Sequence, residues 1–194
     1  MKHKRLLGIA VTLAMVGASL LAATPAVAAG PSDVVYSSTA PMNIIGYDKA
    51  VAEANGFTIV TDQDGTQHSV PVTKQAKAQV AAANSVVKPL NTVYGDCGTS
   101  SLYIQVKWAT VLMVSTGYSV VLASVSHIWN VDGAVSSGTW SNGFSGLNFS
   151  TTWSATHNVN VGNGAHGFGS VRPGSEATLI NGVICASGGP SDSW

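Results

Sequence analysis

Two cysteines could carry chemistry in this chain, and their state decides which chemistry that is. Cys97 and Cys185 are the only cysteines among the 194 residues. In an oxidising compartment an even number of cysteines indicates a disulfide. Such a bond would close a loop of about 88 residues and, in the loop-entropy description, would stabilise the fold by about 4.5 kcal/mol. We therefore predict a disulfide between Cys97 and Cys185.

The segment around Cys97 offers a competing chemistry, that of a nucleophilic thiol. Gly95-Asp96-Cys97-Gly98 resembles the nucleophile turn of chymotrypsin-like cysteine proteases. In that turn, backbone N–H groups stabilise the oxyanion and a histidine acts as base. The resemblance covers four residues, and His68 is the only histidine between residues 30 and 97. A small hydrolase based on Cys97 is kept as an alternative to a non-enzymatic domain.

Histidines are the second candidates for acid–base or metal chemistry. His127 and His157 fall on the inward faces of two predicted strands, so they could be neighbours. Zinc sites collect three or four ligands, often close in sequence, and no carboxylate lies near this pair in the sequence. We expect each to be a core or rim residue with one hydrogen-bond partner. A metal site at His127 and His157 stays an alternative, and we predict no catalytic residue, metal or other cofactor.

Aromatic residues favour binding over catalysis. Trp140, Asn142 and Phe144 lie in a stretch rich in glycine, serine and asparagine, residues 136–148. Exposed rings flanked by amides form stacking platforms for sugars or anchors for protein partners. We predict these three as ligand-binding residues. The alternative is that the rings belong to the core, because aromatic side chains dominate burial in small domains.

The charge pattern excludes several classes of function. Nucleic-acid binding needs a basic face, and a glycosidase needs two facing carboxylates; the sequence indicates neither. After residue 93 only six residues are charged: Asp96, Lys107, Asp132, Arg172, Glu176 and Asp192. We therefore predict a non-enzymatic domain that binds an extracellular partner or surface, with cell-wall or other glycan as a candidate ligand. A secreted inhibitor or toxin-like factor is the third hypothesis.

Alternating residues predict the fold of the C-terminal part, residues 94–194. In residues 151–161, Trp153, Ala155, His157 and Val159 share one face, and hydroxyl and amide residues share the other. That period of two is typical of a half-buried antiparallel strand. Residues 101–107, 111–122, 125–131 and 177–185 are further strand candidates. Turns are expected at 130–133, 141–146, 162–167 and 172–174. We predict a mainly β domain, an antiparallel β-sandwich or small barrel.

The preceding segment, residues 30–93, has a mixed α/β pattern. A short helix is expected over 47–55, with Asp48 as its N-cap and Gly56 as its stop. Strands at 57–61 and 67–70 would form a hairpin around the Asp64-Gly65 turn. An alanine-rich helix over 73–84 follows on propensity, and then a linker at 85–93. This segment is also a candidate pro-region.

Residues 1–29 predict export. A basic start, an apolar run over 6–23 and small residues ending at Ala28-Ala29 are typical of a cleaved signal peptide. An uncleaved membrane anchor is the alternative, which Pro25 and the Ala-x-Ala ending disfavour. Three of the nine basic residues lie in this segment and all nine acidic residues follow it, so cleavage would leave a net charge of −3. We expect a secreted chain with no remaining membrane attachment.

Several segments together resemble a group of uncharacterised secreted proteins from actinobacteria. They include Ala54-Asn55-Gly56-Phe57, Tyr94-Gly95-Asp96-Cys97-Gly98, Val125-Ser126-His127-Ile128-Trp129 and Cys185 with Gly188-Gly189-Pro190. The resemblance spans most of the mature chain and implies secretion from a Gram-positive cell. It implies no activity, site or cofactor.

Overall fold

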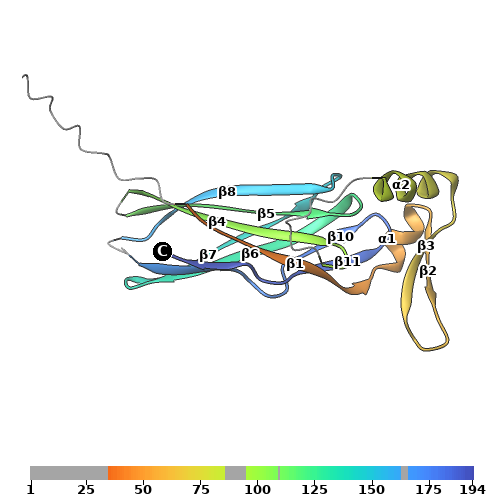
Figure 1. Ribbon diagram of the computed structural model, residues 1–194, viewed down its shortest axis with the longest axis horizontal. Helices are drawn as coiled ribbons and strands as arrows, with labels where there is room; N and C mark the ends of the chain where they lie inside the picture. Colours follow the sequence, from red (N-terminus) through yellow and green to blue (C-terminus); the bar gives the residue numbers. More distant parts are fainter. Residues whose placement is uncertain (1–34, 86–94, 109, 163–165) are drawn as a thin grey trace, which may run out of the picture. The chain divides into compact units, whose positions relative to one another are not determined.

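The computed structural model describes residues 35–85, 95–108, 110–162 and 166–194 (Figure 1). Residues Asp33–Trp194 form one compact unit. The expected signal peptide, and all of the expected linker except residue 85, lie outside the described residues. No helix in the described ranges is long and apolar enough to cross a bilayer.

Ten strands form one sheet, and every pair in it is antiparallel. Its order is β12-β9-β6-β10-β11-β1-β4-β5-β8, and β7 also pairs with β6. The predicted mainly β, antiparallel fold is confirmed. The strands are β1 (Val35–Tyr47), β4 (Gly98–Trp108), β5 (Val111–Val120), β6 (Ser124–Val135), β7 (Gly138–Leu147), β8 (Thr152–Asn160), β9 (Gly167–Val171), β10 (Glu176–Leu179), β11 (Val183–Ser187) and β12 (Ser191–Ser193).

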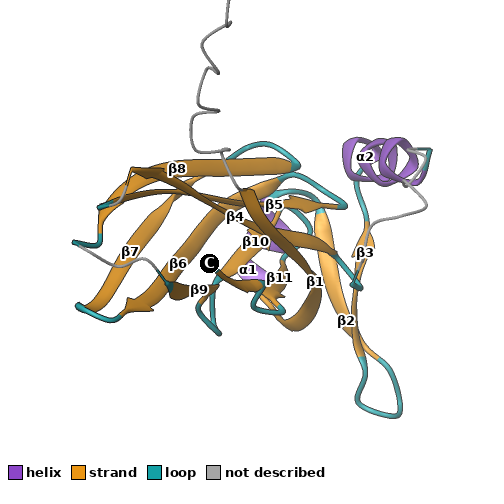
Figure 2. Cartoon of the chain, turned by 60° about the vertical axis from the view of Figure 1, so that its left-hand side comes forward, coloured by secondary structure: helices purple, strands orange, loops and turns teal. Residues whose placement is uncertain are grey.

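The sheet folds over to make a sandwich-like pair of layers (Figure 2). The first half of β6 pairs with β10 and its second half pairs with β9. The inner side of β6 faces the inner side of β5, since the Trp129 indole N–H donates to Thr116 Oγ1 at 2.9 Å. A Cβ on Gly169 of β9 would lie 2.7 Å from Ile104 of β4. The core therefore lies between β4–β5 and β6–β9, where burial of Leu102, Ile104 and Trp129 is complete.

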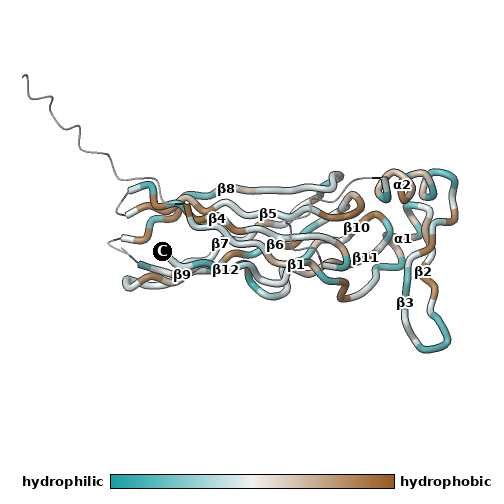
Figure 3. The backbone as a smooth tube through the Cα atoms, viewed as in Figure 1, coloured by the Kyte–Doolittle hydropathy of each residue, from teal (hydrophilic) through white to brown (hydrophobic). Residues whose placement is uncertain are grey.

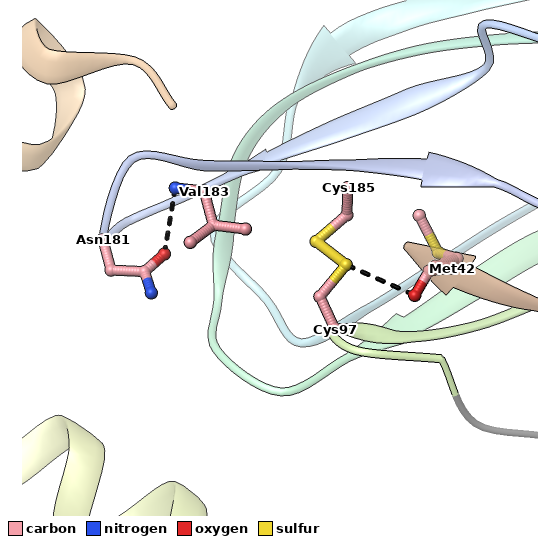
Figure 4. Close-up of a disulfide and its surroundings, with 5 residues drawn as sticks. All are labelled: Met42, Cys97, Asn181, Val183 and Cys185. Atoms are coloured by element: carbon pink, nitrogen blue, oxygen red, sulfur yellow. Dashed lines mark hydrogen bonds between the residues drawn. A yellow bond between two sulfur atoms is a disulfide. The ribbon is translucent and has the colours of Figure 1, made fainter. Parts of the chain in front are cut away.

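A disulfide joins Cys97 to Cys185, as predicted, across 88 positions of sequence (Figure 4). Both cysteines are fully buried. Cys185 lies in β11, opposite Ile44 of β1, and Cys97 immediately precedes β4, whose first residue lies opposite Met42 of β1. The bond therefore ties together the two strands that flank β1.

Most of the expected N-terminal elements are confirmed. Helix α1 (Lys49–Ala54) begins after Asp48, whose Oδ1 accepts from the Val51 N–H at 3.0 Å. Strands β2 (Phe57–Thr61) and β3 (Gln67–Pro71) form a separate hairpin with a hydrophilic tip (Figure 3). Helix α2 (Lys74–Asn84) is capped by Thr73, whose Oγ1 accepts from the Ala76 N–H.

Strand β1 is the longest element that the sequence patterns did not predict. It lies between β11 and β4 in the sheet, although it belongs to the segment expected to precede the β-domain. The compact unit begins near Asp33, so residue 94 does not mark the start of the sheet. The reason is that long-range pairing, which a local pattern does not record, stabilises β1.

Three local expectations need correction. Residues 130–133 and 141–146, expected as turns, lie inside β6 and β7. Gly133 makes room for a ring, because a Cβ at this position would overlap the Trp140 indole. The single strand expected over 177–185 is two strands, β10 and β11, separated by a turn in which Gly182 has a φ of 79°.

Candidate functional site

The predicted ligand residues Trp140, Asn142 and Phe144 lie on β7, not in a loop. Trp140 and Phe144 are half-buried and pack against the core. The Phe144 ring meets Trp153 of β8 edge-on, with 5.6 Å between ring centroids. Phe144 therefore takes the core position that the sequence left open as the alternative to an exposed platform, whereas Trp140 also lines an open cleft on this layer. Asn142 is half-buried beside them on the same strand.

The two candidate metal-binding histidines lie in different surroundings. His127 is 7% exposed and lies 4.3 Å from Trp153, measured between ring centroids. Burial lowers the pKa of His127, which favours its neutral form. His157 is exposed, four positions from Trp153 along β8, or about 13 Å at the usual rise per residue. In the described ranges no group of three or more His, Cys, Asp or Glu side chains could hold a metal ion.

The Cys97 sulfur is not a free thiol. It is bonded to Cys185 and lies 3.5 Å from the carbonyl oxygen of Met42 in a buried position (Figure 4). A nucleophilic cysteine acts as a thiolate and needs access to substrate. The expected alternative of a Cys97-based hydrolase therefore has no nucleophile in this structure.

The outer side of β1, β4, β5 and β8 carries a regular array of hydroxyl groups. The strand register aligns three rows of four residues across these strands. We call these twelve positions the hydroxyl face: Ser37, Tyr103, Ser115 and Thr156; Thr39, Ser101, Gly117 and Ser154; Pro41, Thr99, Ser119 and Thr152. Ten of the twelve bear a hydroxyl and none bears a charge. The face can therefore donate and accept hydrogen bonds without attracting ions.

Part of this hydroxyl array is free of internal hydrogen bonds. Ser115 and Thr156 bond to each other at 2.8 Å, and the Thr99 hydroxyl donates to the Ala40 carbonyl at 3.2 Å. Among the described residues, no intramolecular hydrogen bond involves the side-chain hydroxyls of Ser37, Thr39, Tyr103, Ser119, Thr152 or Ser154. Those groups are available to water or to a ligand.

An open cleft of about 490 Å³ lies within the hydroxyl face. Its lining includes Thr39, Ser101, Ser119 and Ser154, with the Tyr103 ring at its side. Gly117 lies in the middle and adds no side chain. Tyr103 is 44% exposed, although it is a large aromatic residue. The cleft thus combines an accessible ring with the unbonded hydroxyls of Thr39, Ser119 and Ser154, whereas the Ser101 hydroxyl donates to the Gly117 carbonyl at 3.4 Å.

The sequence pattern predicted the outward hydroxyl residues of β8, but it did not identify the hydroxyl face as a site. The alternation in residues 151–161 already placed Thr152, Ser154 and Thr156 together. Thr99, Ser101 and Tyr103 alternate in the same way, but only the register shows that their hydroxyls align with those of β8. Each strand shows the alternation of hydroxyl residues in its own sequence, but the array forms only when the strands pair in this register.

Comparison with known proteins gives this site no relative: no family model, curated protein or solved structure matches the chain.

Proposed function

We propose that this protein is a secreted, non-enzymatic module that binds an uncharged polysaccharide, such as cell-wall or other extracellular glycan, through its hydroxyl face. The observation that carries the proposal is the alignment of ten hydroxyl residues over four neighbouring strands. Sugars present donors and acceptors of the same kind, so the two surfaces are complementary in hydrogen bonding.

The aromatic ring supplies the apolar part of recognition. Tyr103 lies at the side of the cleft and exposes almost half of its surface. A sugar ring has an apolar face of C–H groups that can pack on such an aromatic ring while its hydroxyls reach the neighbouring serines and threonines. The absence of charge over these twelve positions favours a neutral ligand over an acidic one.

Secretion is part of the proposal and has separate support. The N-terminal sequence has the pattern of a cleaved signal peptide. A structural disulfide is compatible with an oxidising compartment outside the cytosol. A protein that reaches the medium would meet wall and extracellular glycans in large excess.

The direct test is retention of the purified mature protein on insoluble peptidoglycan, chitin and cellulose. We expect retention on at least one of them, and an apparent affinity about fivefold weaker for Tyr103→Ala, which corresponds to about 1 kcal/mol of lost stacking. Phe149→Ala is the matched control, because Phe149 is 74% exposed and lies outside the face.

Hydroxyl recognition is tested by a second pair of variants. Ser119→Ala combined with Ser154→Ala should weaken retention, whereas Ser145→Ala, on the exposed side of β7, should not. Wild-type protein that passes through all three glycans unretained would remove the proposal. Equal weakening by Ser145→Ala would show that the site lies elsewhere.

A further inference from the structure

We infer that the chain carries a second saccharide site on the opposite side of the sandwich, so that one molecule can bind two glycan segments. The site is an open cleft of about 540 Å³ over the outer side of β6, β7 and β9, which we call the Arg172 cleft. Its lining includes Asp132, Ala134, Ser141, Phe168, Ser170 and Arg172, together with the predicted ligand residue Trp140. The part of this inference that concerns two glycan segments depends on the proposed function of the hydroxyl face.

The two clefts lie on opposite surfaces because their strands share one core. Trp129 and Val131 of β6 are buried, and the Trp129 indole donates to Thr116 on the inner side of β5. Residues at alternate positions of a strand point to opposite sides, so Asp132 and Ala134 are on the outside of β6. The hydroxyl face is on the outside of the other layer. One rigid ligand cannot cover both faces.

The shape of the Arg172 cleft follows from the sizes of paired residues. Ala134 of β6 lies between Thr139 of β7 and Phe168 of β9 in the register. The small alanine leaves a hollow beside the larger Phe168, a residue that is 47% exposed. Here too an accessible aromatic ring borders a recess.

Next to the ring is an ion pair with spare hydrogen-bonding capacity. Arg172 Nε donates to Asp132 Oδ2 at 2.5 Å, and its Nη2 donates to Asp132 Oδ1 at 2.6 Å and to Ser141 Oγ at 3.1 Å. A guanidinium has five N–H groups, so two remain after these three bonds. Each carboxylate oxygen can accept a further bond. The cleft therefore offers donors and acceptors side by side.

The pairing also indicates a neutral ligand. The hydrogen bond from Arg172 holds the pKa of Asp132 below its usual range, so the carboxylate stays charged and the pair has no net charge at neutral pH. An anionic ligand would have to compete with a bidentate carboxylate for Arg172 and would meet the charge of Asp132. A polyhydroxylated ring can accept from the guanidinium and donate to the carboxylate without breaking the pair.

The test is a titration of the mature, ¹⁵N-labelled protein with chitotetraose and with cellotetraose, followed by amide NMR shifts. We expect two separate groups of shifted amides, one around Ser101 and Ser119 and one around Ser141 and Ser170. Phe168→Ala should raise the dissociation constant reported by the second group of amides at least fivefold and leave the constant reported by the first group unchanged. Tyr103→Ala should raise the constant reported by the first group and leave that of the second unchanged.

The outcomes separate the two proposals. Shifts confined to the first group, with either sugar, would overturn the second site and leave the proposed function intact. Shifts confined to the second group would support the Arg172 cleft and overturn both the proposed function and the two-segment inference. No shift with either sugar overturns the second site.

Two controls complete the test of the Arg172 cleft. Oligogalacturonate serves as the acidic probe, and tighter binding of it in the Arg172 cleft would overturn the neutral-ligand inference. If Phe168→Ala loses the dispersed spectrum of a folded protein, Ser170→Val keeps the ring and tests the same cleft. An unchanged dissociation constant for the second group of amides in Ser170→Val would then overturn the second site.

Discussion

Gly117 is important for the hydroxyl face because it has no side chain. A Cβ at this position would collide with the backbone oxygen of Trp153 and lie 3.1 Å from the Cα of Ser154, so the backbones of β5 and β8 approach more closely than a side chain allows. The same missing side chain leaves the centre of the cleft open. One residue thus serves both the packing of two strands and the shape of the proposed site.

We expect Gly117→Ala to destabilise the domain by about 2 kcal/mol, since overpacking in tight sites costs about 1–3 kcal/mol. Urea unfolding, with the slope held fixed, measures the change. Gly146→Ala is the matched control, because it is also a strand glycine and its nearest neighbour to an added Cβ is 3.9 Å away. Equal effects at both positions would show that loss of glycine itself, and not the collision, is responsible.

His127 makes the stability of the domain depend on pH. Burial lowers its folded-state pKa, so the unfolded chain binds a proton more readily than the folded one. Its stability contribution is complete above the unfolded pKa of about 6.5 and decreases as the pH falls below that value. His127→Phe should reduce the loss of the free energy of unfolding between pH 7 and pH 5.

The measurement is urea unfolding at both pH values, with a proton titration of the His127 ring. His157→Gln is the control, because His157 is exposed. A pH dependence that persists unchanged in His127→Phe, or that disappears in His157→Gln, would contradict the assignment to His127.

Strand β1 joins the two parts of the sheet, because it lies between β11 and β4. It pairs with β11 on one side and with β4 on the other. It also contributes Ser37 and Thr39 to the hydroxyl face. Removing it would expose the edges of two strands whose inner sides are in the core, which favours aggregation.

The pro-region hypothesis therefore leads to a definite expectation at the level of this element. A chain that begins at residue 94 lacks β1 and should fail to give the cooperative urea transition of a chain that begins at residue 30. Circular dichroism and size-exclusion chromatography of the two chains provide the comparison. A folded, monomeric 94–194 fragment would restore the hypothesis that residues 30–93 are a detachable pro-region.

At the scale of the whole molecule, one covalent bond closes the sheet around β1. The Cys97–Cys185 disulfide spans 88 positions, and a loop of that length contributes about 4.5 kcal/mol in the loop-entropy description. Net stabilities of domains are about 5–15 kcal/mol. The bond is therefore a large fraction of what keeps the domain folded.

Reduction of the disulfide, or the double variant Cys97→Ala and Cys185→Ala, should lower the free energy of unfolding by about 3–5 kcal/mol. Urea unfolding with and without a phosphine reductant measures it. Intact-mass analysis of the untreated protein should show the deficit of two hydrogens that a disulfide produces. Unchanged stability of the reduced protein would contradict this role.

Local sequence determined the elements whose signals are complete within a few residues. Asp48 identified the start of α1 because an N-cap bonds to a backbone N–H three residues away, and alanine-rich propensity identified α2. The alternation in residues 151–161 identified β8 because the strand period is local. The cysteine count identified the disulfide because only two cysteines exist.

Tertiary structure alone decided which strands are neighbours and in what register. β1 needed β4 and β11 to be a strand, and the Trp140 ring of β7 fills the space beside Gly133 of β6. The hydroxyl face and the Arg172 cleft are products of that pairing. The physical reason is that a β-strand makes its hydrogen bonds to distant segments, so its partners, and any site built across them, are not recorded in its own residues.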